Sequence, residues 1–240
     1  VSVTRRTMFL DILRSALEGF VQAGWTLSLI VLIEFFLEPQ GLRGETLQSL
    51  VFSAGFIGMI FSLFFLPLVP LKKTTWLMLP TLLCGVFLVG AGAADSLLMF
   101  VSLVMLAHIL PALRVPLLTE IYHENYPTRR RGFYHSFALI ASQVTVVGFG
   151  YWAGQRLDAD LESWRSIYLI MAGAAICSAL ALKQIPSSPT LSVRTRNPLK
   201  AFRWLRHDKA FSYILFIWFT FGFANLSIMP IRVQYLSQQL

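Results

Sequence analysis

The sequence predicts an all-α fold, a polytopic bundle of transmembrane helices. Of its 240 residues, 56% are hydrophobic and only 13% are charged, whereas a soluble domain carries about 25% charged residues. The apolar residues gather in runs of about 17–25 residues, the length at which a helix crosses the hydrocarbon layer of a membrane. A membrane β-barrel would instead show strands of about 10 residues with alternating polarity, and the sequence shows no such pattern. We therefore expect the lipid bilayer to surround most of the chain.

Seven apolar stretches follow one another, separated by polar breaks. In chain order they cover residues 9–37, 47–68, 76–92, 97–121, 133–153, 164–182 and 211–230. The first is the longest, and we place its lipid-depth part at residues 16–36. The fourth contains Pro111 and Pro116, which a helix tolerates inside a bundle because neighbouring helices satisfy the carbonyl groups that proline frees. Each stretch is long enough for one crossing, so we predict seven membrane spans.

Lysine and arginine are distributed unevenly among the polar breaks. The N-terminal segment, the second break, the fourth break and the interval at residues 183–209 hold two, two, three and seven of them. The other breaks hold one, none and two, and the C-terminal tail holds one. Because basic loops stay in the cytoplasm, we expect a cytoplasmic N-terminus in the cytoplasmic membrane. This distribution accounts for the net charge of +8 without a nucleic-acid partner.

The interval at residues 183–209 divides the chain. We expect a six-helix bundle over residues 1–183, a basic cytoplasmic linker over 184–209, and a seventh span over 210–240 that begins a second bundle. In the linker, Asn197-Pro198 is typical of a helix start, and apolar and basic residues then recur at helical spacing. This segment is an amphipathic helix on an anionic leaflet or a helix packed under the bundle, and the two interpretations are compatible.

Several short motifs accompany this topology. The fourth break has the form E-x(6)-P-x(3)-R-G, the sixth span opens with Trp-Arg, and the fifth span bears glycines. These residues are Glu120, Pro127, Arg131 and Gly132; Trp164 and Arg165; and Gly148, Gly150 and Gly154. Together with the topology, they resemble the major facilitator superfamily of transporters over about residues 1–230.

The resemblance implies one six-helix half of a transporter plus the first helix of the other half. The family binds its solute between two halves and rocks one against the other. The chain is therefore expected to be a fragment of a longer protein, or to pair with a second chain. In the second break the family has a glycine- and aspartate-containing motif where this chain has Leu71-Lys72-Lys73-Thr74, so that aspartate's gating role is not carried over. The family's arginine in the outer half of span four is not matched by Arg114, which lies nearer the cytoplasm.

Polar side chains at hydrocarbon depth are candidate functional residues, because they are costly there. We expect six of them to line a solute cavity: Glu18, Gln22, Thr26, His108, Arg114 and Gln143. Arg114 lies about 10 Å above the cytoplasmic end of its span at 1.5 Å per residue, close to the depth of Glu18, so the two can form an ion pair. Alternatively, Glu18 pairs with Arg14 one turn away and Arg114 extends to the headgroups. For His108, a hydrogen bond to a neighbouring helix is favoured over titration or solute binding.

Other residues are expected at the surfaces of the bundle. Pro127, Arg131 and Gly132 match the family's loop motif, which is involved in gating. Gly150 and Gly154 form a G-x-x-x-G step that favours close helix packing. Tyr122 and Tyr126 are typical of aromatic anchors at the membrane interface.

The leading functional prediction is a secondary active transporter, or its N-terminal part, that moves a small solute by alternating access. An intramembrane enzyme is disfavoured because the sequence has no H-E-x-x-H, no paired intramembrane aspartates and no G-x-S-x-G. His123 and His135 are too isolated to indicate a metal site, and no cofactor is expected. A seven-span receptor or scaffold fits the span count, but such receptors usually place the N-terminus outside, against the charge distribution.

Overall fold

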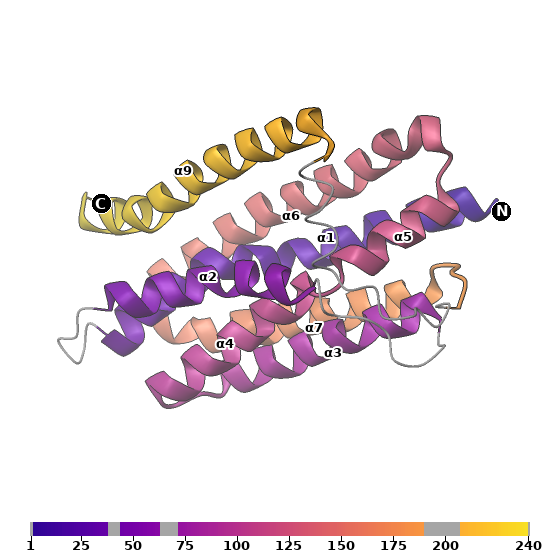
Figure 1. Ribbon diagram of the computed structural model, residues 1–240. Coiled ribbons are helices and arrows are strands. Elements are labelled where there is room, and N and C mark those ends of the chain that lie inside the picture. The colour runs from indigo at the N-terminus through magenta and orange to yellow at the C-terminus, as the bar shows by residue number, and fades with distance from the viewer. Residues whose placement is uncertain (1, 38–43, 63–71, 190–206, 240) are drawn as a thin grey trace. The chain divides into compact units, whose positions relative to one another are not determined.

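The computed structural model describes residues 2–37, 44–62, 72–189 and 207–239 (Figure 1). The regular elements of these residues are all helices. The chain divides into two compact units, Val1–Ser192 and Val193–Leu240, and each is described separately here.

The first unit contains seven α-helices and three shorter helical turns among its described residues. The α-helices are α1 (Val3–Val31), α2 (Glu45–Ser62), α3 (Lys73–Gly92), α4 (Leu97–Ala112), α5 (Val115–Asn125), α6 (Arg131–Ala159) and α7 (Trp164–Gln184). The turns are the π-helical η1 (Leu32–Leu37), which continues α1, and the 3-10 helices η3 (Thr128–Arg130) and η4 (Leu161–Ser163).

Five helical stretches of the described chain are long and apolar enough to cross a membrane. They are Val3–Leu37, Lys73–Gly92, Leu97–Asn125, Thr128–Ala159 and Leu161–Gln184. Thr46–Ser62 and Lys209–Ala224 are apolar but shorter over the described residues. The prediction of an all-helical protein with several membrane-length helices is thus confirmed, and the count of seven spans stays a prediction.

The fourth apolar stretch, predicted as one helix, is divided in two. Helix α4 ends at Ala112, and Arg114 is the N-cap of α5. Pro116 stands in the first turn of α5, where the absence of an N–H group costs nothing because that group has no partner inside a helix anyway. At the end of α4, the backbone N–H of Arg114 donates to the carbonyl of Pro111, three residues earlier, at 3.3 Å. Arg114 therefore sits at a joint between two helices.

Helix α1 packs most extensively against α6 and α7, while α3 packs against α4 and α7 and α2 packs against α4 (Figure 1). The contact between α1 and α6 depends on Gly19. A Cβ atom at this position would lie 2.6 Å from the carbonyl oxygen of Ser142 and 2.6 Å from Cβ of Thr145. Since such distances are well inside van der Waals contact, only glycine allows this approach.

Hydrogen bonds connect the helix ends that lie next to the lysine- and arginine-rich breaks of the sequence. Thr4 Oγ1 donates to the carbonyl of Asn125 at 3.0 Å, and Asn125 Nδ2 donates to that of Pro186 at 2.7 Å. The N–H of Lys73 donates to the carbonyl of Ser188 at 3.4 Å. The N-terminus, the start of α3, the end of α5 and the residues after α7 therefore lie at one end of the unit, as the alternation of basic breaks predicts. These bonds also attach Pro186 and Ser188, which follow α7, to α5 and α3.

The opposite end of the unit is held by aromatic packing and by Arg165. Trp164 is fully buried, with its ring centroid 5.6 Å from that of Phe100 and 5.8 Å from that of Tyr168. The guanidinium of Arg165 donates to the carbonyl of Gly92 at 3.1 Å and to the carboxylate of Asp95 at 2.9 Å. This end therefore ties α4 and the turn after α3 to the start of α7.

The second unit contains α9 (Lys209–Gln239), within which the predicted seventh span falls. Asp208 precedes this helix and accepts a hydrogen bond from the N–H of Phe211 at 3.0 Å, as an N-cap does. The predicted amphipathic helix from Asn197-Pro198 lies outside the described residues.

Candidate functional site

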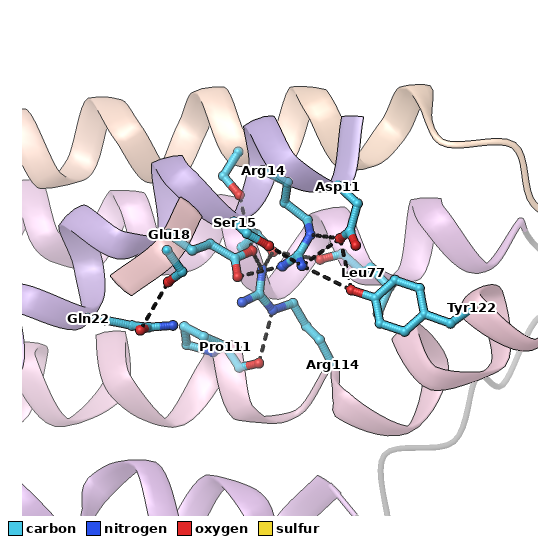
Figure 2. Close-up of polar contacts among 12 residues, drawn as sticks. Asp11, Arg14, Ser15, Glu18, Gln22, Leu77, Pro111, Arg114 and Tyr122 are labelled. Carbon is cyan, nitrogen blue, oxygen red and sulfur yellow. Dashed lines mark hydrogen bonds and ion pairs between the residues drawn. The ribbon is translucent and has the colours of Figure 1, made fainter. Parts of the chain in front are cut away.

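Four ionised side chains meet inside the first unit and form what we call the charge cluster: Asp11, Arg14, Glu18 and Arg114 (Figure 2). The first three project from one face of α1, since residues three and four apart are neighbours on a helix. The fourth comes from the joint between α4 and α5. The cluster carries two positive and two negative charges, so it is neutral as a whole.

Asp11 and Arg14 form the inner part of the charge cluster. Arg14 Nη2 donates to Asp11 Oδ1 at 2.7 Å, and the two side chains are 5% and 1% exposed. Tyr122 supplies a second donor, with its hydroxyl 2.8 Å from Asp11 Oδ1, and it accepts from Arg14 Nη2 at 3.1 Å. A buried ion pair needs such additional bonds, because its Coulombic attraction alone does not offset the loss of hydration.

The tyrosines do not have the role of interface anchors that the sequence predicted. Tyr122 is 7% exposed and Tyr126 is 3% exposed, and both hydroxyls point to Asp11, that of Tyr126 at 3.4 Å. Burial, and after it the Asp11 carboxylate, raises the pKa of Tyr126, so its hydroxyl keeps the proton that it donates. The carboxylate of Asp11 favours burial of these phenols, because it gives them an acceptor inside the bundle.

Glu18 joins the two arginines of the charge cluster. Its Oε2 accepts from Arg14 Nη1 at 2.5 Å, and its Oε1 accepts from Arg114 Nη1 at 2.5 Å. Ser178 of α7 adds a third bond to Oε1, at 3.1 Å. Both ion pairs that the sequence left as alternatives are therefore present together.

Arg114 points into the bundle rather than towards its end. Besides Glu18, its Nη1 donates to Thr81 Oγ1 of α3 at 2.9 Å, and its Nε donates to the carbonyl of Pro111 at 2.9 Å. Only 8% of its side chain is exposed. The alternative that Arg114 extends to the headgroups is therefore wrong, because partners on three helices hold the guanidinium inside.

A cavity of about 530 Å³ adjoins the charge cluster. Charged and hydroxyl groups of the cluster and its surroundings form one part of its wall, and apolar and aromatic groups form the rest. The lining consists of Arg14, Ser15, Glu18, Val21, Gln22, Trp25, Gly55, Met59, His108, Pro111, Ala112, Arg114, Val115, Leu118, Tyr122, His135, Leu139 and Ser142. Its size falls within the range of small-molecule sites, about 300–1,000 Å³.

Four of the six predicted cavity residues line this cavity, namely Glu18, Gln22, His108 and Arg114. Thr26 and Gln143 are exposed and do not belong to its lining. On α6 it is Ser142, not Gln143, that lines the cavity. Ser142 donates to Gln22 Oε1 at 3.2 Å. Successive residues on a helix point about 100° apart, so an error of one residue moves a side chain off the cavity face.

His108 does not form the hydrogen bond to a neighbouring helix that the sequence favoured. The residue is 7% exposed, and its Nε2 has no partner within the described chain. Its ring lies against that of Trp25, with the centroids 5.6 Å apart. Trp25 Nε1 also lacks a partner among the described residues. Together with Nδ1 of His135, three ring nitrogens of the cavity-lining residues are thus buried without a hydrogen-bond partner among the described residues.

The loop motif and the glycine pair lie away from the cavity. Pro127 precedes η3, and Arg131 begins α6. A Cβ atom at Gly132, Gly150 or Gly154 would meet no described atom within 4 Å. These glycines leave an open surface on α6, and their roles in gating and helix packing stay predictions.

Glu120 of the loop motif and Glu124 both pair with Lys73, the second lysine of the second break. Lys73 Nζ lies 3.0 Å from Glu120 Oε2 and 2.5 Å from Glu124 Oε1. Glu124 also accepts from Ser188 Oγ at 2.6 Å. A charged contact thus joins the start of α3 to the C-terminal half of α5.

Sequence reasoning missed Asp11, Tyr122, Thr81 and Ser178 as members of the site. One signal was available for Asp11, because Asp11, Arg14 and Glu18 repeat at helical spacing on a single face. No comparable signal marks Thr81 or Ser178, each of which comes from another helix. Within the described chain, no group of three histidine, cysteine or acidic residues is placed to hold a metal ion.

No protein-family model and no curated protein matches the chain.

Proposed function

We propose that the chain is a secondary active transporter, or the N-terminal part of one, that moves a small solute across the cytoplasmic membrane by alternating access. The observation that carries this proposal is the charge cluster on the wall of the 530 Å³ cavity. Ionisable residues at membrane depth are rare and commonly mark the path of a solute or an ion.

The energetics of the charge cluster support a role beyond holding the helices together. A buried ion pair is a weak source of stability, because well-packed apolar residues often serve as well or better. Two arginines and two acids are nevertheless present, and Arg14, Glu18 and Arg114 line the cavity. A role in recognising or moving a solute accounts for their position.

The position of Arg114 supports a link between the cavity and the motion of helices. Its guanidinium contacts Glu18 on α1 and Thr81 on α3, while its backbone forms the joint between α4 and α5. A solute that competes for these partners would act directly on that joint. Alternating access needs such a differential contact, since a ligand shifts a conformational equilibrium only if it binds one state better.

The fold resembled by the sequence is the major facilitator superfamily, with one six-helix half followed by the first helix of the second. The described part of the first unit has six helical segments if α4 and α5 are counted as one, and this number equals that of one transporter half, which supports the proposal. In that arrangement α9 begins the second half, and the charge cluster forms one wall of a central path. The N-terminus would face the cytoplasm.

Cysteine labelling tests alternating access without knowledge of the solute. In a chain whose Cys84 and Cys177 are replaced by alanine, Ser142→Cys places one thiol on the cavity wall. A membrane-impermeant maleimide should label this thiol in right-side-out and in inverted vesicles. The control Asp160→Cys, between α6 and α7, should react from one side only. Labelling of Ser142→Cys from a single side would contradict the proposal and favour a receptor or scaffold.

A further inference from the structure

Gln22 is the exposed polar residue among the described residues that line the cavity. The other exposed residues of the lining are the apolar Met59, Val115 and Leu139. Gln22 Oε1 accepts from Ser142 at 3.2 Å, whereas its Nε2 bonds to no described residue. The amide nitrogen carries two N–H groups, so the cavity presents free donors next to an apolar surface.

Arg114 provides a further free donor close to Gln22. Its Nε and Nη1 bind Pro111, Glu18 and Thr81, but its Nη2 donates to no described residue and is not fully buried. Glu18, which holds the guanidinium, precedes Gln22 by one helical turn. Gln22 and Arg114 also line together a second cavity of only about 60 Å³, so the amide and the guanidinium lie close to each other (Figure 2). Two neighbouring donors fit an acceptor with two oxygen atoms.

The aromatic rings of the wall do not add to this contact. Nε1 of Trp25, Nε2 of His108 and Nδ1 of His135 are fully buried, so a solute in the cavity does not reach these atoms. The polar contact available to a solute is therefore that of Gln22 and Arg114.

The charges on the cavity wall favour an anionic group at this place. Arg14, Glu18 and Arg114 line the cavity, whereas Asp11 is only 1% exposed and does not belong to the lining. Both oxygens of Glu18 already accept from the arginines. A group bound to Nη2 lies nearest to the guanidinium of Arg114, and Coulombic attraction falls with distance. The wall therefore attracts an anion more strongly than a cation.

We propose that the cavity binds small monocarboxylates with an apolar body. The carboxylate accepts from Arg114 Nη2 and Gln22 Nε2, and the body lies against Met59, Val115 and Leu139. Hydrogen bonds from arginine to a carboxylate are about twice as strong as bonds between neutral groups. This inference rests on the proposed transport function, to which it adds the class of substrate.

The test compares three probes of similar size that differ in charge. They are cyclohexylacetate, an anion, cyclohexylacetamide, which is neutral, and cyclohexylethylamine, a cation. Their affinities are measured calorimetrically at neutral pH on the full chain in phosphatidylcholine nanodiscs, with empty nanodiscs as the blank for partition into lipid. The carboxylate should bind at least about fivefold more tightly than the amide and at least about tenfold more tightly than the amine.

Variants of Gln22 identify the site. Gln22→Met keeps the length of the side chain but removes its N–H donors, so it should weaken binding of the carboxylate by about tenfold. The matched control is Gln143→Met, because Gln143 is exposed on α6 but lies outside the lining, and it should leave the affinity unchanged. Gln22→Glu adds a negative charge and should reverse the preference, so that the amine binds more tightly than the carboxylate. Size-exclusion profiles equal to that of the unaltered chain establish that the variants are folded.

The inference is overturned if the carboxylate does not bind, if the amide or the amine binds as tightly, or if Gln22→Met and Gln143→Met behave alike. The ranking of the three probes on the unaltered chain does not depend on the folding of any variant. These outcomes are separate from those of the labelling experiment with Ser142→Cys. Labelling from both sides without binding of the carboxylate would sustain the transport function and reject the substrate class. Binding of the carboxylate with labelling from one side would do the reverse.

Discussion

Glu18 and Arg114 lie 96 residues apart in the sequence, and their side chains meet at 2.5 Å inside the helical bundle. Glu18 simultaneously pairs with Arg14 on its own helix. The carboxylate therefore connects a local pair, formed within α1, to a residue at the joint of two other helices. The charge cluster is therefore formed by tertiary contacts between helices and not by α1 alone.

The pair should show a large energetic coupling. Glu18→Gln leaves the charge cluster with a net positive charge, and Arg114→Gln leaves it with a net negative one, whereas the double variant is neutral again. We expect the double variant to be more stable than the sum of the single effects by about 1–3 kcal/mol, measured by unfolding in mixed micelles. The pair Asp95 and Arg165, 87% and 35% exposed, is the control, and its coupling should stay below about 1 kcal/mol. Equal couplings would mean that burial does not strengthen the pair.

Transport should depend on Arg114. Arg114→Ala removes the partner of Glu18 at the helix joint, so uptake into proteoliposomes should fall to the level of protein-free liposomes. Insertion should persist, because the apolar lengths of the helices are unchanged. The exposed Arg156, which lies 5.7 Å from the ring centroid of Trp152, provides the control Arg156→Ala, with unchanged uptake expected. Full uptake by Arg114→Ala would show that the ion pair has no role in transport.

The hydroxyl of Tyr122 should stabilise the fold more than that of Tyr126. Tyr122 donates to Asp11 at 2.8 Å, whereas the bond from Tyr126 is 3.4 Å long. Tyr122→Phe removes a donor from a buried carboxylate and should cost about 1–3 kcal/mol. Tyr126→Phe should cost less. Thermal unfolding in detergent ranks the two variants, and the reverse order would contradict the geometry.

Glu124 should contribute more than Glu120 to the contact with Lys73. Glu124 also binds Ser188, and it is 30% exposed where Glu120 is 57% exposed. We expect Glu124→Ala to lower the free energy of unfolding by about 1–2 kcal/mol and Glu120→Ala by less than about 0.5 kcal/mol. The difference can be measured by chemical unfolding of the two variants, and indistinguishable losses would argue against the bonds to Ser188.

A side chain at Gly19 should be tolerated poorly. Gly19→Val places atoms against Ser142 and Thr145 of α6, and overpacking of this kind costs about 1–3 kcal/mol. Gly150→Val is the matched control, because a Cβ atom there meets no described atom within 4 Å. Melting temperatures in detergent distinguish the two. A stable Gly19→Val variant would show that α1 and α6 separate easily.

The sequence by itself determined the helical, membrane-length character of the chain and the positions of its polar residues along those helices. The length of an apolar run, and the position of a residue within that run, can be counted directly along the chain. For this reason Glu18 and Arg114 could be predicted to form an ion pair from their positions in the first and fourth runs. Only the tertiary structure decided which way each helix faces and which helices are neighbours. Lipid and protein are both apolar, so hydrophobicity does not set the rotation of a helix about its axis. Close packing at Gly19 and the bonds to Asp11, Glu18 and Arg114 set it instead. They bring Ser142, Tyr122, Thr81 and Ser178 to the cluster or the cavity and leave Gln143 outside the lining.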